Sequence, residues 1–111
     1  MTVEQINDDE FNQKVLEGSK DKPVLVDFWA EWCGPCKAAA PYVDKLSEGV
    51  GDSAKVVKVN IDENPSIAAD YGVMSIPTFI LFKDGEPVER SSGFTPNFVN
   101  EWTDKINSAL L

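Results

Sequence analysis

The sequence predicts an α/β domain in which helices cover both faces of a mixed β-sheet. Strand-like and helix-like segments alternate along its 111 residues in the order β-α-β-α-β-α-β-β-α. The nearly continuous apolar run at 24–29 is typical of a strand buried on both faces. A hydrophobic content of 42%, with three Trp and six Phe, favours a well-packed core. We therefore expect one domain over residues 1–111, a three-layer α/β/α sandwich with five strands and four helices.

The first half of the chain is expected to form two strand–helix units. Residues 3–6 suit a short edge strand, and a following helix capped by Asp8 should stop at Gly18. After the buried strand, apolar residues at 36–50 recur at helical spacing, which predicts a second helix. Pro41 lies inside this helix and should kink it, because proline lacks a backbone N–H donor.

The middle of the chain predicts a second interior strand at 56–60. Asn64 and Pro65 then suit the N-cap and first position of a short helix, which Gly72 should close. A strand–helix–strand unit of this kind implies a parallel pair of strands with a right-handed crossover.

A hairpin and a helix are expected at the C-terminal end. Residues 78–82 and 87–92 flank Asp84-Gly85, a dipeptide that favours the tight turn of a β-hairpin. Thr95 should cap a final helix that begins at Pro96 and carries an apolar stripe as far as Leu110.

Charge and hydropathy exclude several classes of partner. The net charge of −9 should repel nucleic acid and anionic lipid. The acidic N-terminal segment shows no secretory signal, and no apolar run approaches the length of a membrane span. We expect a cytoplasmic protein, or one of an organelle or plastid stroma if the chain is a mature form. In such reducing compartments a cycling disulfide is more usual than a permanent one.

Both cysteines of the chain lie in the stretch Trp32-Cys33-Gly34-Pro35-Cys36, between the buried strand and the second helix. A Cys-x-x-Cys pair in a short chain is first a redox candidate. Cys33 falls at the helix N-terminus, where free N–H groups stabilise a thiolate, and Cys36 lies one turn away. Cys33 could therefore attack a disulfide and Cys36 could resolve the mixed disulfide, without a bound cofactor.

Other uses of the two cysteines fit less well. Zinc needs about four ligands, and a chain without His or a second cysteine pair offers only half of such a site. Two inert, buried cysteines are an alternative, although Trp32, Gly34 and Pro35 favour a surface junction. The absence of His also excludes a hydrolase of the Cys–His type.

The run from Phe28 to Lys37 resembles the thioredoxin family. The similarity extends to Asp27, Pro41, residues 71–73 and 76–78, and Gly93. It implies the thioredoxin fold and a protein-disulfide reductase with no bound cofactor and no metal. It also implies a monomer that reduces disulfide-containing proteins and receives its electrons from a thioredoxin reductase.

The resemblance gives Asp27 a role in proton transfer. A carboxylate in an apolar strand should be desolvated, which raises its pKa and suits it to exchange a proton with Cys36. Lys58, the odd charge in the neighbouring strand, would assist. A simple ion pair between Asp27 and Lys58 is the alternative interpretation, and both can hold.

The resemblance also implies a surface that docks partner proteins. Pro77 matches the cis-proline of the family, although it could simply be a rigid start of a strand. The backbone of Ile76 could then pair with an extended substrate segment. The expected apolar rim around Cys33 consists of Trp32, Gly34, Pro35, Ile76, Pro77 and Gly93.

Some positions depart from the family pattern and leave alternatives open. Ala38, Ala39 and Ala40 are smaller than usual, whereas Met74 and Phe94 add apolar area, so a changed preference among partners is a hypothesis. Related oxidases and isomerases usually carry His before the second cysteine, and this chain does not. An oxidant or isomerase is thus the second choice among enzymes. A binding module with an incidental redox centre is the alternative outside enzymes.

Overall fold

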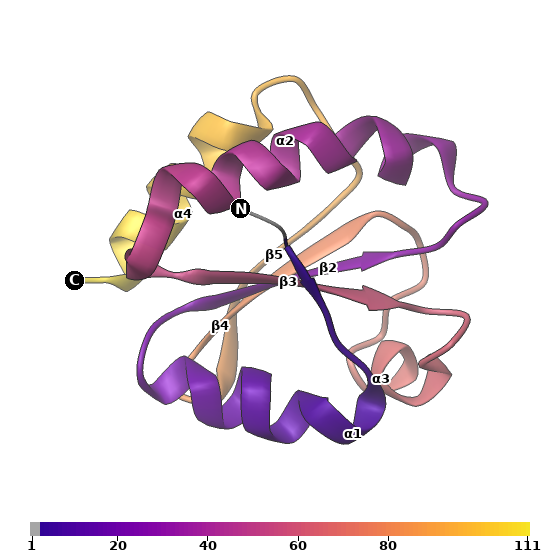
Figure 1. Ribbon diagram of the computed structural model, residues 1–111, viewed down its shortest axis with the longest axis horizontal. Helices are drawn as coiled ribbons and strands as arrows, with labels where there is room; N and C mark the ends of the chain where they lie inside the picture. The colour runs from indigo at the N-terminus through magenta and orange to yellow at the C-terminus, as the bar shows by residue number, and fades with distance from the viewer. Residues whose placement is uncertain (1–2) are drawn as a thin grey trace.

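The computed structural model, described here for residues 3–111, has the expected layers. The strand order is β1-β3-β2-β4-β5, with α2 and α4 on one face of the sheet and α1 and α3 on the other (Figure 1). The strands are β1 (Glu4–Gln5), β2 (Val24–Trp29), β3 (Lys55–Asn60), β4 (Thr78–Lys83) and β5 (Glu86–Ser92). The helices are α1 (Asp8–Phe11), α2 (Gly34–Val50), α3 (Pro65–Asp70) and α4 (Phe98–Ala109). Short π and 3₁₀ segments span Asn12–Glu17, Gly18–Lys20 and Gly51–Ser53.

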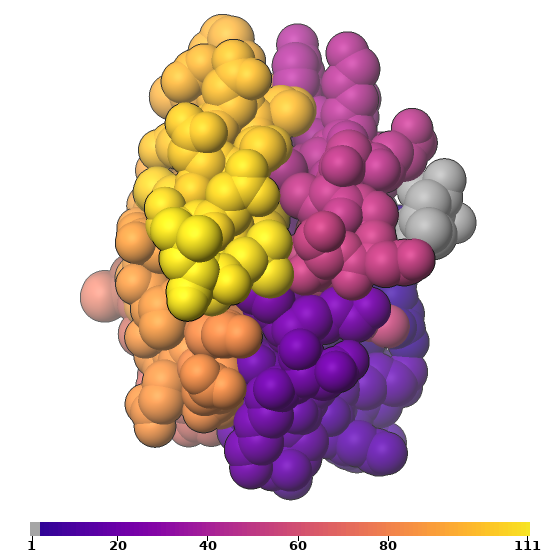
Figure 2. Space-filling view, turned by 90° about the vertical axis from the view of Figure 1, so that its left-hand side faces the viewer, coloured from indigo at the N-terminus to yellow at the C-terminus, as the bar shows by residue number. Residues whose placement is uncertain are grey.

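Strand β2 lies at the centre of the sheet. It pairs in parallel with β3 and antiparallel with β4, so that Asp27 is in register with Lys58 on one side and Phe79 on the other. The crossover through α2 therefore joins parallel neighbours, as predicted. On each face of the sheet the strands share a separate apolar core with the helices that cover it. Helices α2 and α4 pack side by side over one of these cores (Figure 2).

The first helix differs from the prediction at both ends. Its N-cap is Asn7, whose backbone N–H donates to the Glu10 carboxylate at 3.0 Å, so Asp8 is the first helical residue and not the cap. The helical chain also continues past Gly18 as a 3₁₀ turn. Ser19 in this turn is fully buried, and its Oγ accepts the N–H of Gly85 at 2.8 Å. This contact with the hairpin turn holds the extra turn in place.

Asn64 is the N-cap residue of α3, as predicted, and its side chain has a further role. It precedes α3, but its side chain makes no capping bond to that helix. Its Oδ1 accepts the backbone N–H of Asp8 at 2.8 Å, and its Nδ2 donates to the carbonyl of Asn60 at 3.1 Å. The side chain thus satisfies a free N–H at the start of α1 from across the fold.

The C-terminal elements agree better with the sequence. Asp84 and Gly85 have φ values of 55° and 82°, as the predicted primed turn between β4 and β5 requires. The last helix begins at Phe98, after Asn97, and not at Pro96. The carbonyl of Thr95 accepts the N–H of Phe98 at 3.1 Å, which forms a turn before the helix.

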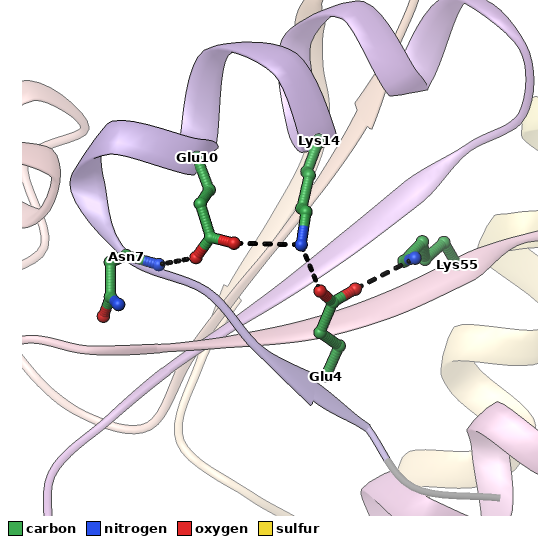
Figure 3. A network of polar contacts seen from close by, with 5 residues as sticks. All are labelled: Glu4, Asn7, Glu10, Lys14 and Lys55. Atoms are coloured by element: carbon green, nitrogen blue, oxygen red, sulfur yellow. Dashed lines mark hydrogen bonds and ion pairs between the residues drawn. The ribbon is translucent and has the colours of Figure 1, made fainter.

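An ion-pair network fixes the edge strand β1 (Figure 3). The Glu4 carboxylate pairs with Lys14 after α1 and, at 3.0 Å, with Lys55 of β3. Lys14 also pairs with Glu10 at 2.9 Å. These contacts lower the pKa of Glu4, chiefly because Lys14 donates a hydrogen bond to it. Helix and strand are thereby joined at the sheet edge.

None of the helices within residues 3–111 is long and apolar enough to span a membrane.

Candidate active site

The two cysteines lie where the chain leaves β2 and begins α2. Cys33 is the N-cap of α2, and its Sγ accepts the backbone N–H of Cys36 at 3.1 Å. The carbonyl of Cys33 accepts the N–H of Lys37 at 3.1 Å, which starts the helical ladder. The helix therefore directs both an N–H group and the positive end of its dipole at this sulfur. The predicted position of Cys33 is confirmed.

Cys33 and Cys36 form a disulfide, with their Cα atoms 5.2 Å apart. Both residues are largely covered, with 4% and 5% of their surface exposed. They form a small apolar cluster with Ala30, against which Ile61 and Ile76 pack. The neighbours Trp32, Gly34 and Pro35 are exposed. The disulfide thus lies just beneath the surface of the protein, and the side chains packed against it are apolar.

Asp27 is buried within the sheet, with 3% of its surface exposed. Its Oδ1 has no hydrogen-bond partner among residues 3–111. Burial raises the pKa of this carboxyl to about 7, against the opposing effect of the Lys58 cation. Desolvation favours the neutral form because a buried carboxylate loses its hydration. The raised pKa agrees with the expectation for a carboxyl in an apolar strand.

Lys58 is half-buried on the adjacent strand. Its ammonium lies 5.1 Å from the ring centroid of Trp29, a cation–π distance. The Lys58 charge lowers the pKa of Asp27. Lys58 therefore influences the carboxyl electrostatically and at the same time packs on an aromatic face.

The expected rim residues lie in different environments. Gly93 is exposed, and its N–H donates to the carbonyl of Pro77 at 2.8 Å. The Ile76–Pro77 bond is cis. Ile76 is half-buried against the cysteine cluster, whereas Pro77 is buried. The structure thus brings Ile76 to the disulfide from more than forty positions away in the sequence, while the ring of Pro77 lies beneath the surface.

Trp32 has a partner that sequence reasoning missed. Its side chain is exposed by 68%, and its indole N–H donates to Asp62 Oδ2 at 2.8 Å. Asp62 is placed by Asn60, whose Oδ1 accepts the N–H groups of Asp62 and Glu63 at 2.9 and 3.3 Å. An Asn two residues before an Asp at the end of a strand is a signal of such a turn. Asp62 orients the tryptophan beside Cys33.

Met74 and Phe94, the two departures from the family pattern that add apolar area, differ in how far their side chains are exposed. Met74 is 96% exposed. Phe94 is partly buried against the core under α2 and α4, and its ring lies 5.0 Å from Tyr42 and 5.9 Å from Phe98. Met74 therefore extends the exposed apolar surface, whereas much of Phe94 fills space between helices.

Comparison with known proteins agrees with this geometry. A model of the thioredoxin family matches residues 2–105. The chain belongs to the thioredoxin family. A thioredoxin of Porphyra purpurea is 50% identical over 103 residues, 93% of this chain and 94% of that protein. Thioredoxin 1 of Synechococcus elongatus is 55% identical over 91 residues, 82% and 83% of the two chains. A thioredoxin of Rickettsia prowazekii is 47% identical over 104 residues, 93% and 97%.

Membership of the thioredoxin family and the paired cysteines together define the activity. The chain is a protein dithiol–disulfide oxidoreductase, with Cys33 and Cys36 as its redox-active pair. Disulfide-containing substrates and a reductase partner follow in general from the family. Among residues 3–111, no group of three or more Cys, Asp or Glu side chains is placed to hold a metal ion.

Proposed function

We propose that Cys33 is the attacking nucleophile of a protein-disulfide reductase and that Cys36 resolves the intermediate. The observation that carries the proposal is the N–H of Cys36, which donates to Cys33 Sγ at 3.1 Å at the start of α2. In the reduced chain the same N–H would stabilise the thiolate of Cys33. Cys36 lies inside the helix and not at its N-cap, which suits it to the second step.

The electron and proton balance of the cycle is simple. The Cys33 thiolate attacks one sulfur of the substrate disulfide and forms a mixed disulfide, and the other substrate sulfur leaves as a thiolate. Cys36 then loses its proton and attacks Cys33 Sγ. The Cys33–Cys36 disulfide forms, and the second substrate thiol is released. The substrate gains two electrons and the chain loses two.

Asp27 is the proposed proton acceptor for Cys36, with Lys58 as its electrostatic partner. A base works best when its pKa lies near the operating pH, and burial raises the pKa of Asp27 to about 7. The Lys58 charge opposes a further rise. The two effects together keep the pKa of this carboxyl near neutral pH.

Substrates would dock on the exposed apolar rim. Trp32, Gly34, Pro35 and Gly93 present the surface around the disulfide, and Ile76 packs on the cysteine cluster beneath it. An extended segment of a partner could add to the Ile76 backbone as a strand does. Pro77, which is buried, would support this segment from below.

We also propose a wider setting for the activity, by analogy with the family. We place the chain, as a single domain over residues 1–111, in the cytoplasm or a plastid stroma, where it acts as a monomer. It takes electrons from a thioredoxin reductase and passes them to protein disulfides, with no other cofactor bound. The bacterial and algal sources of its relatives support this setting.

Insulin reduction tests the proposal. The chain is supplied in turn with an NADPH-linked and a ferredoxin-linked thioredoxin reductase, and precipitation of the insulin chains is followed. We expect turnover with one of these electron sources and none for Cys33→Ser. Cys36→Ser should accumulate a mixed disulfide with the substrate. Reduction by Cys33→Ser at the wild-type rate would overturn the assignment.

Alkylation gives an independent check of the nucleophile. The reduced chain is treated with iodoacetamide at neutral pH, and modified residues are identified by mass spectrometry. Cys33 should react faster than a free thiol in an unstructured peptide, because the helix N-terminus stabilises its thiolate. If Cys33 reacts no faster than the peptide, the activated-nucleophile argument fails.

A further inference from the structure

Strand β5 and the residue after it hold both ends of the segment that carries Ile76. We define the docking loop as residues 71–77, between the end of α3 and the start of β4. At its first end, the Arg90 guanidinium donates to the carbonyls of Tyr71 and Gly72, the latter at 2.8 Å. At its other end, the N–H of Gly93 donates to the carbonyl of Pro77 at 2.8 Å. Both anchors therefore come from one short stretch of chain.

Arg90 suits the first anchor chemically. Carbonyls at the end of a helix lack partners within the helix and lie at the negative end of its dipole. A guanidinium has a rigid fork of N–H donors that can bond two such oxygens at once. Arg90 itself is set in β5 opposite Ile80 of β4. The sheet therefore fixes the position of Arg90, and its two hydrogen bonds hold the first end of the loop beside β5.

The loop between the anchors contains an exposed apolar side chain and the residue that packs on the disulfide. Met74 is 96% exposed, and Ile76 packs against Cys33 and Cys36. Only four residues, 73–76, separate the Arg90 bonds from Pro77. A displacement of the first end of the loop must therefore move Ile76 relative to the disulfide. Without Arg90, the Tyr71 end keeps its backbone bonds to α3 and its ring contacts with Phe11 and Phe82, but its carbonyls lose their tie to β5.

We propose that Arg90 is a positioning residue for substrate recognition, acting through the carbonyls of Tyr71 and Gly72. The inference rests on the proposed docking of substrates at Ile76. Arg90 makes no contact with the reacting sulfurs in this scheme. It holds the backbone of the docking loop in the position and orientation in which an extended substrate segment can pair with it.

The test compares a large and a small substrate. The pre-reduced chain is mixed with insulin or with a small aromatic disulfide, and the limiting rate and half-saturating concentration are measured in single turnovers. The small disulfide reaches Cys33 without covering the docking loop. Arg90→Met keeps the aliphatic stem and removes the donors, while Arg90→Lys keeps the charge without the fork. Lys45→Met, roughly 16 Å along α2 from Gly34, is a charge-matched control.

We expect Arg90→Met to raise the half-saturating insulin concentration about three- to tenfold, with the limiting rate and the small-disulfide reaction unchanged. Arg90→Lys should recover part of the difference, and Lys45→Met should behave as wild type. Backbone amides at 73–76 should exchange hydrogen faster in Arg90→Met.

Other outcomes overturn the inference. An unchanged half-saturating concentration for Arg90→Met shows that the anchor does not act on recognition. An equal loss on both substrates shows that Arg90 only supports the fold. A wild-type chain that reduces neither substrate instead refutes the proposed function itself, so the two failures are distinguishable.

Discussion

Replacing Asp27 by Asn should make the stability of the folded chain less dependent on pH. The pKa of this carboxyl is raised from 3.8 to about 7, chiefly by burial. The folded chain therefore binds the proton more tightly than the unfolded chain does. As pH rises through this window, the unfolded state releases its proton first and wild-type stability falls. The Asp27→Asn variant has no carboxyl proton to lose at this position, so it escapes the decline.

The size of the effect follows from the two pKa values. One pKa unit is about 1.4 kcal/mol, so ionisation of Asp27 costs the folded chain about 4 kcal/mol above neutral pH. Any cost of the buried amide is the same at each pH and cancels from the comparison. The free energy of unfolding of Asp27→Asn minus that of wild type should thus rise by about 4 kcal/mol between pH 4 and pH 8.

Urea unfolding of the oxidised proteins at several pH values across this range measures the difference. Lys58→Met is the control for the neighbouring charge. Because the Lys58 cation lowers the pKa of Asp27, its removal should extend the decline in stability to higher pH and increase its total size. A difference between Asp27→Asn and wild type that stays constant across the range would refute the assignment of a raised pKa.

Two further predictions concern stability. Glu4→Gln should lower the free energy of unfolding at neutral pH by less than about 1 kcal/mol, as for exposed ion pairs. Because Lys14 lowers the pKa of Glu4, this loss should start to shrink in urea titrations below the ordinary 4.5 and vanish once pH is below the lowered pKa. A loss that does not shrink as the pH falls contradicts the ion-pair explanation. Asn64→Ala should cost about 2 kcal/mol, since it leaves the Asp8 N–H without its acceptor. Calorimetry against the exposed Asn107→Ala checks this, and equal melting temperatures would contradict it.

Local sequence signals predicted much of the fold. The buried strand β2, the Asp84-Gly85 turn and the position of Cys33 at the start of α2 each follow from a few neighbouring residues. The departures from the prediction have two causes. The cap of α1 at Asn7 and the start of α4 at Phe98 depend on bonds between near neighbours, whereas elsewhere a distant partner adds to or overrides the local preference. Asn64 bonds to Asp8, which is 56 positions away, and Ser19 bonds to Gly85, which is 66 positions away. No local pattern contains these contacts.

The residues of the candidate site also fall into two groups, those that the local sequence marks and those that contacts between distant segments place. Cys33, Cys36 and Asp27 were recognisable because a motif or a charge in an apolar strand marks each of them. The bond from Trp32 to Asp62 and the Arg90 anchor join surface side chains to groups that lie far away in the sequence. Ile76 and Gly93 were found only through resemblance to a family. Geometry between segments, not residue type, decides their position.

The strand order determines which parts of the molecule open most readily by local unfolding. The disulfide follows β2, which is hydrogen-bonded on both sides, and such central strands open only in global unfolding. The docking loop depends on β5, an exposed edge strand with one paired neighbour. Hydrogen exchange should therefore be slowest within β2, the strand that leads to the disulfide, and faster in β5 beneath the docking loop. The redox site stays rigid while the recognition surface can adapt, so changes that retune partner choice need not disturb the redox chemistry.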